Sequence, residues 1–323
     1  MTRIPVAVCL FVLSLAVASP RSAAAPGKPR ESLIQEAERA VNDRNWEKAV
    51  TNYRQAFAQA PGTVDEYVVV IDMLRMLGKQ EEGLAMAKEG LQHHSGSGEL
   101  EFQVGNQLSA LERFNDAYAQ FQKLDSKLRK DRPELRDDNF FYMYGAAAER
   151  SGRIAEAIRL FQQAIAKAPE EEMPARAARA YNYLGYLLLD QNRDLERALE
   201  FVQKANELAP NQGPYVDSLG WANYKTGQYE HALSDLLRAE RLLKRDGNLG
   251  PEVLDHLAQT YFRLGHRDEA IQCIRRAMEL APKEKAYLAR LQEFQNGKTV
   301  EPVPLDFLKE DGNSTDKRRG RRR

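Results

Sequence analysis

The chain has 323 residues, with 47 Lys or Arg against 47 Asp or Glu, so its formal net charge at pH 7 is zero. Hydrophobic residues make up 43% of it, which is ordinary for a soluble protein. No apolar run reaches the roughly 20 residues that a membrane-spanning helix requires. Strand patterns are nearly absent, so we expect an all-α fold.

The first 24 residues have the layout of a secretory signal peptide. Arg3 supplies a basic start, residues 4–18 are apolar apart from Ser14, and a stretch of small residues follows Arg21. Cleavage after Ala18 or after Ala24 would leave small residues at both key positions. A retained membrane anchor is the alternative, although the apolar run is short for one. Residues 25–29 would then be a linker.

Small residues recur along the rest of the chain at a regular spacing. The recurring positions are Ala49, Gly83, Ala117, Ala157, Ala198, Ala232 and Ala270. Three of the intervals are 34 residues long, the period of a two-helix repeat, and the others are 40, 41 and 38 residues long. Two antiparallel helices cross closely only where such small residues meet. The pattern predicts about seven stacked helical hairpins, in which even the β-prone run at residues 67–71 becomes helical.

The longer intervals divide the predicted solenoid. We expect repeats one to three at residues 30–127 and repeats four to seven at residues 138–282, with a charged insertion between them. Residues 244–250 are a second, shorter insertion. Residues 283–296 are predicted to form a helix that caps the exposed apolar end of the solenoid. Residues 297–323 contain two prolines and then turn polar and basic, and we expect them to be disordered.

No catalytic or metal-binding pattern is present in the sequence. The five histidines lack metal-site spacing, and no phosphate-binding loop or nucleophile motif occurs, so we expect no enzyme activity, cofactor or metal. Without the signal segment, which contains Cys9, one cysteine remains, and no intramolecular disulfide can form. We interpret this residue, Cys273, as a packing residue, and a reactive thiol is the alternative.

The candidate binding surface is the inner wall that the first helices of the hairpins form. In repeats four to seven its positions are rich in aromatic residues with polar residues between them, a combination that suits an extended peptide. The candidates are Tyr142, Asn182, Tyr183, Tyr186, Asp217, Trp221, Tyr224, Lys225, Asp255, Phe262 and Arg263. Alternatively, several of these rings pack between repeats, above all Tyr183 and Tyr224.

The span from about residue 30 to residue 282 resembles tetratricopeptide-repeat proteins, which form right-handed superhelical solenoids. The segments 181–186, 217–221 and 255–257 look like exported bacterial members. Some of those are outer-membrane lipoproteins that act as adaptors for periplasmic proteases, and others support polysaccharide export or pilus assembly. The chain departs from them in lacking a lipidation cysteine. It also lacks the Lys, Asn and Arg set of carboxylate clamps, and holds Tyr142, Ala146 and Tyr183 in equivalent places.

These features predict an exported, non-enzymatic scaffold or adaptor, periplasmic or associated with the outer membrane, that binds an extended protein segment or an envelope enzyme. The alternative is a structural component of an envelope polysaccharide-export or pilus-assembly machine. Six of the seven residues from Lys317 to Arg323 are basic, and in that alternative they would contact anionic lipid or polysaccharide. A merely solvated end is the other interpretation, and nucleic acid is not expected as a partner.

The signal peptide can be tested directly. N-terminal sequencing of the protein purified from its native cells should give a chain that begins at Ser19 or Ala25, because small residues precede both positions. A cytoplasmic protein that retains Met1 would contradict the prediction of export.

Overall fold

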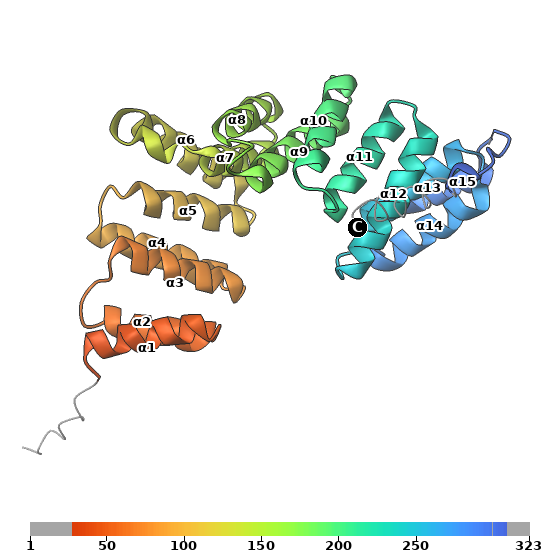
Figure 1. Ribbon diagram of the computed structural model, residues 1–323. Helices are drawn as coiled ribbons and strands as arrows, with labels where there is room; N and C mark the ends of the chain where they lie inside the picture. Colours follow the sequence, from red (N-terminus) through yellow and green to blue (C-terminus); the bar gives the residue numbers. More distant parts are fainter. Residues whose placement is uncertain (1–27, 299, 309–323) are drawn as a thin grey trace, which may run out of the picture.

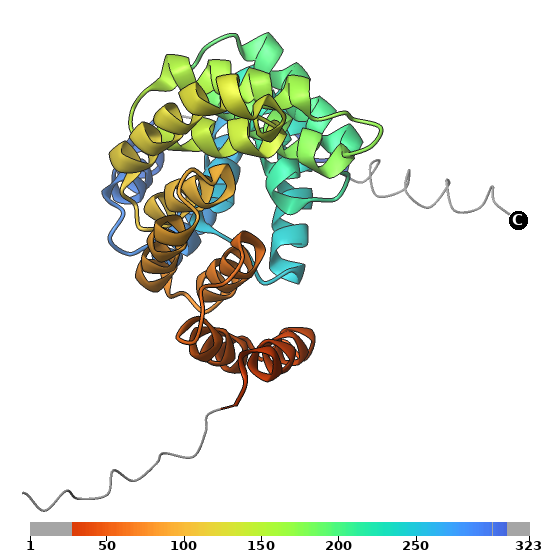
Figure 2. The same cartoon turned by 90° about the vertical axis from the view of Figure 1, so that its left-hand side faces the viewer.

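The computed structural model describes residues 28–298 and 300–308, and every regular element in these two stretches is a helix. Figure 1 shows the helices stacked side by side along a curved solenoid, and Figure 2 shows that they wind around a common axis. No helix of the described stretches is long and apolar enough to span a membrane. The predicted signal peptide and the basic run at residues 317–323 lie outside them.

Seven consecutive helix pairs account for most of the described chain, and each pair forms one hairpin (Figure 1). They are α1 (Arg30–Asn42) with α2 (Trp46–Phe57), α3 (Val64–Met76) with α4 (Gln80–His93), α5 (Gly98–Ala110) with α6 (Phe114–Asp131), α7 (Asp138–Arg150) with α8 (Ile154–Lys167), α9 (Pro174–Asp190) with α10 (Leu195–Leu208), α11 (Gly213–Lys225) with α12 (Tyr229–Arg245), and α13 (Pro251–Arg263) with α14 (Arg267–Leu280). The predicted all-α hairpin solenoid is confirmed.

The insertions and the cap have defined structures. Residues 127–138 extend α6 by a turn, form the short 3-10 helix η1 (Pro133–Leu135) and then start α7. The second insertion prolongs α12 to Arg245 before a loop. A last helix, α15 (Lys285–Asn296), follows the seventh hairpin. It buries Tyr287 and Phe294 against the apolar cluster of α12, α13 and α14, as a capping helix requires.

Small residues set the distance between the two helices of each hairpin. The six recurring alanines, from Ala49 to Ala270, are all fully buried. On the facing helices, a methyl group added to Gly185 would lie 2.6 Å from Val202 Cγ1, and one added to Gly220 would lie 2.6 Å from Leu236 Cγ. These helices therefore approach too closely to admit any side chain at the contact, which is why the small-residue spacing predicts the hairpins.

The prediction of disorder from residue 297 onward is wrong for residues 300–308. This segment folds back on the last hairpin, where the backbone N–H of Val303 donates to the carbonyl of Leu264 at 2.9 Å. His266 Nε2 bonds to the carbonyl of Val303 at 2.7 Å, and Leu305 and Phe307 pack on the last apolar cluster. Gly265, with φ of +85°, gives the segment room to approach. The apolar side chains of Val303, Leu305 and Phe307 are partly buried on the last hairpin, and this burial stabilises the folded segment.

Overpacking one hairpin tests the small-residue constraint. Ala157→Leu should lower the free energy of unfolding by roughly 1–3 kcal/mol, because extra methyl groups have no space at a fully buried helix contact. Ala155→Leu is the matched control, since Ala155 lies on the same helix, α8, and is exposed. Chemical denaturation measures both variants. Equal stability of the two variants would mean that the contact does not set the helix distance.

The single described cysteine should be chemically inert in the folded protein. The side chain of Cys273 is buried, and burial raises the pKa of its thiol to about 11. At pH 8 the folded protein therefore holds very little thiolate, the reactive form. In a Cys9→Ser background, a thiol reagent should react slowly with the native protein and rapidly in guanidinium chloride. Rapid reaction of the native protein would favour the reactive-thiol alternative.

Candidate functional site

A cavity of about 500 Å³ lies between the first helices of hairpins five, six and seven. We call it the aromatic groove, and its lining residues are Tyr186, Asp190, Trp221, Tyr224, Lys225, Tyr229, Asp255, His256, Gln259, Arg263 and Arg290. Most of them stand on α9, α11 and α13, whose other faces pack within their own hairpins. The groove thus crosses the seams between hairpins, and residues far apart in the sequence meet there.

A stack of flat side chains forms one wall of the aromatic groove. The Trp221 indole stacks on the Tyr224 ring, one turn along α11, with ring centroids 4.8 Å apart and planes 6° apart. It also stacks on the His256 ring of α13, at 4.2 Å and 13°. Asp217 orients that imidazole, because its carboxylate Oδ1 lies 3.0 Å from His256 Nδ1. The indole is therefore fixed by contacts from two hairpins.

Tyr186, on α9, lines the same groove and is 37% exposed. Partial burial raises the pKa of its hydroxyl to about 12, so the hydroxyl keeps its proton at neutral pH and can donate a hydrogen bond. Tyr186 is thus a large apolar surface with a polar tip, the kind of side chain that protein interfaces favour.

Two cations of the groove, Lys225 and Arg263, are each held by a hydrogen bond. Lys225 Nζ lies 5.1 Å from the Trp221 ring centroid and donates to Asn192 Oδ1 at 2.7 Å. Arg263 Nε donates to the Tyr224 hydroxyl at 3.4 Å. These contacts hold both cations beside aromatic rings, where cation–π attraction adds to their placement.

One carboxylate oxygen of Asp255 accepts no hydrogen bond from the described residues. Its Oδ2 accepts from Arg290 at 2.9 Å and from Gln259 at 3.2 Å. Its Oδ1 is buried and has no hydrogen-bond partner among the described residues. Burial raises the pKa of this carboxyl group, and Arg290 opposes that rise. Buried acceptors are almost always paired in folded proteins, so Oδ1 is an exception beside the aromatic groove.

The structure brings six of the eleven predicted site residues together. The six that line the aromatic groove are Tyr186, Trp221, Tyr224, Lys225, Asp255 and Arg263. Asp217 lies behind its wall, holding His256. Phe262 stacks on Phe294 of the capping helix at 4.7 Å and lines a neighbouring cavity of about 400 Å³.

The remaining predicted residues lie outside the groove, at the seam between hairpins four and five. Tyr183 stacks on Phe161 at 4.6 Å and donates to Glu149 Oε2 at 3.1 Å. Tyr142 packs against Tyr183 at 5.6 Å and carries the Arg179 guanidinium 3.9 Å from its centroid. Tyr183 thus follows the alternative of packing between repeats. Asn182 is partly buried, and its Oδ1 has no hydrogen-bond partner in the described chain.

Sequence reasoning missed several groove residues, namely Asp190, Tyr229, His256, Gln259 and Arg290. His256, Gln259 and Arg263 follow one another at helical spacing on α13, so the periodicity of that helix could have identified them. Arg290 comes from the capping helix, and no local pattern connects it to α13. The described residues contain no group of three or more His, Cys, Asp or Glu side chains that could hold a metal ion.

Comparisons with known proteins agree with this architecture. Family models described as "Tetratricopeptide repeat" match residues 97–172, 142–213 and 251–284. The TPR repeat-containing protein PA4667 of Pseudomonas aeruginosa is 33% identical over 132 residues, a stretch that covers 40% of this chain and 20% of that relative. The chain therefore spans about a fifth of the relative's length.

Solved structures show the same fold at low sequence identity. A tetratricopeptide-repeat protein from Parabacteroides merdae superposes with a TM-score of 0.59 at 13% identity, over 83% of this chain and 99% of that one. PilF of Pseudomonas aeruginosa superposes with a TM-score of 0.56 at 19% identity, over 72% and 97% of the two chains. The hairpin solenoid, the repeat-family matches and these relatives identify the chain as a tetratricopeptide-repeat protein, with the fold of a protein-interaction scaffold.

Proposed function

We propose that the chain is an exported scaffold that binds an extended segment of a partner protein in the aromatic groove. The observation that carries the proposal is the stack of Tyr224, Trp221 and His256 beside a cavity of about 500 Å³. Rings that are already fixed lose little conformational entropy on binding, so they make efficient anchors. Aromatic residues in such positions often dominate the binding energy of an interface.

The polar groups of the groove suit a peptide backbone. The Tyr186 hydroxyl, which lines the groove, would donate a hydrogen bond to a backbone carbonyl of the peptide. The partner segment would lie across the three first helices, with an apolar side chain on Trp221.

Export rests on the signal-like N-terminal sequence alone. A basic residue, an apolar run and small residues precede the first hairpin, as in proteins that leave the cytoplasm. The partner is therefore sought in the cell envelope, among its proteases, hydrolases and assembly proteins. A protease or hydrolase would indicate an adaptor, whereas a channel or synthase would indicate a part of a secretion machine.

Removing either anchor ring should weaken partner binding. Trp221→Ala or Tyr186→Ala should cost about 2 kcal/mol of binding free energy, close to a thirtyfold loss of affinity. The partner is first captured from an envelope extract with the wild-type protein, and its affinity for each purified variant is then measured by calorimetry. Melting curves should show that both variants remain folded.

Met76→Ala is the matched control for this measurement. Met76 ends α3 outside the groove and is 59% exposed, so the variant loses an apolar surface of similar kind without touching the groove. Its affinity for the partner should equal that of the wild type. Unchanged affinity in folded Trp221→Ala and Tyr186→Ala proteins would place the binding site elsewhere on the solenoid.

A further inference from the structure

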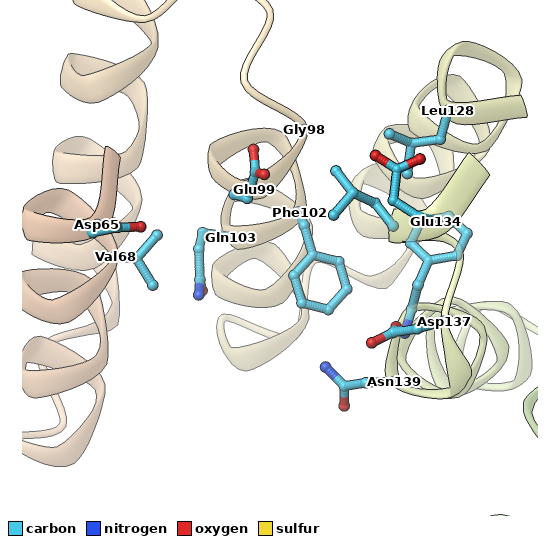
Figure 3. Close-up of a pocket in the computed structure, with 12 residues that line it drawn as sticks. Asp65, Val68, Gly98, Glu99, Phe102, Gln103, Leu128, Glu134, Asp137 and Asn139 are labelled. Carbon is cyan, nitrogen blue, oxygen red and sulfur yellow. The ribbon is translucent and has the colours of Figure 1, made fainter. Parts of the chain in front are cut away.

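A second cavity, of about 310 Å³, lies in the N-terminal half of the solenoid, between the first helices of hairpins two, three and four. Figure 3 shows its lining, with Asp65 and Val68 from α3 facing Phe102 and Gln103 from α5 and Asn139 from α7. It shares no lining residue with the aromatic groove. We call it the acidic pocket.

The floor of the acidic pocket is apolar and packs on the core. Phe102 forms its centre, and the Phe102 ring packs 5.7 Å from Phe121 and 6.3 Å from Phe140, both of which are buried in the core. Val68, Leu128, Leu135 and Phe140 add further apolar side chains to this lining. An apolar floor of this size could bury one aliphatic side chain of a ligand, which would gain about 1.5–3 kcal/mol from leaving water.

The rim of the pocket is negative. Four carboxylates line it, those of Asp65, Glu99, Glu134 and Asp137, and no Lys or Arg is among the lining residues described. Two exposed arginines, Arg132 and Arg176, lie near the rim carboxylates but do not line the pocket.

Arg132 pairs with Glu134 and lies 3.8 Å from Glu99, while Arg176 lies 4.0 Å from Asp137. These two cations leave the four rim carboxylates with a net negative charge. Three different hairpins, together with η1, contribute those carboxylates, so the charge surrounds the opening and would attract basic groups on either side of a bound side chain.

We propose that the acidic pocket is a docking site for a partner-protein segment in which an aliphatic side chain is flanked by Arg or Lys. The aliphatic group would occupy the floor at Phe102, and the flanking cations would meet the rim carboxylates. The chain's own basic run does not supply this combination, because residues 309–323 contain no aliphatic or aromatic side chain. The site is independent of the aromatic groove and does not rest on the function proposed for it.

The test uses the full chain and a fluorescein-labelled peptide, Gly-Arg-Arg-Leu-Arg-Arg-Gly, followed by anisotropy at about 0.15 M salt, where distant charges are screened. The combined variant Asp65→Asn, Glu99→Gln, Glu134→Gln should weaken binding about tenfold or more, because it removes three of the rim charges. A peptide with Ser in place of Leu should also bind about tenfold more weakly, since the floor then stays unfilled.

The matched control is Glu171→Gln, Glu172→Gln, Glu230→Gln, which makes the same change in net charge at exposed positions outside the pocket. It should bind the peptide as the wild type does, and melting curves should show both triple variants folded. Equal losses in the two triple variants, or equal affinities of the Leu and Ser peptides, would overturn the proposal. Peptide binding that occurs only after residues 317–323 are deleted would also overturn the proposal, because the chain's own tail would then occupy the pocket.

Discussion

The close approach of the two helices in each hairpin is the constraint on which the rest of the structure depends. A methyl group added to Gly185 or Gly220 on a first helix would lie 2.6 Å from Val202 or Leu236 on the second helix, and the recurring alanines of the second helices are fully buried. One face of each first helix is therefore buried within its own hairpin. The residues of another face are then free to line cavities at the seams between hairpins, so hairpin packing decides which side chains can bind a partner.

The two cavities show how one architecture can offer different chemistry. Each crosses the first helices of three consecutive hairpins, and neither could exist in a single repeat. The aromatic groove presents Trp221 with mixed charges and a buried acceptor on Asp255. The acidic pocket presents Phe102 within a ring of carboxylates. A scaffold with two such sites could hold two segments at once, and linked binding of that kind raises the effective affinity for a single partner.

The sequence predicted the hairpins well because their cause is local: a small residue at a fixed spacing is visible in the chain itself. It also placed Tyr186 and Trp221 together, since each follows the first-helix glycine of its repeat. It left open whether Tyr183 would pack between repeats, as it does on Phe161, and it could not predict that Arg290 would reach Asp255. Those contacts depend on the angle between neighbouring hairpins, which is set by many side chains across each seam and by no single motif.

The central claim is that the first helices of hairpins five to seven face a bound partner in the cell. Site-specific photo-crosslinking tests it most directly, with a benzophenone amino acid at Tyr186 in the groove and, separately, at Glu200, which is exposed on α10 of the same hairpin. The account predicts a discrete crosslinked protein from position 186 and none from position 200. Identical products from both positions, or a product from position 200 alone, would contradict it.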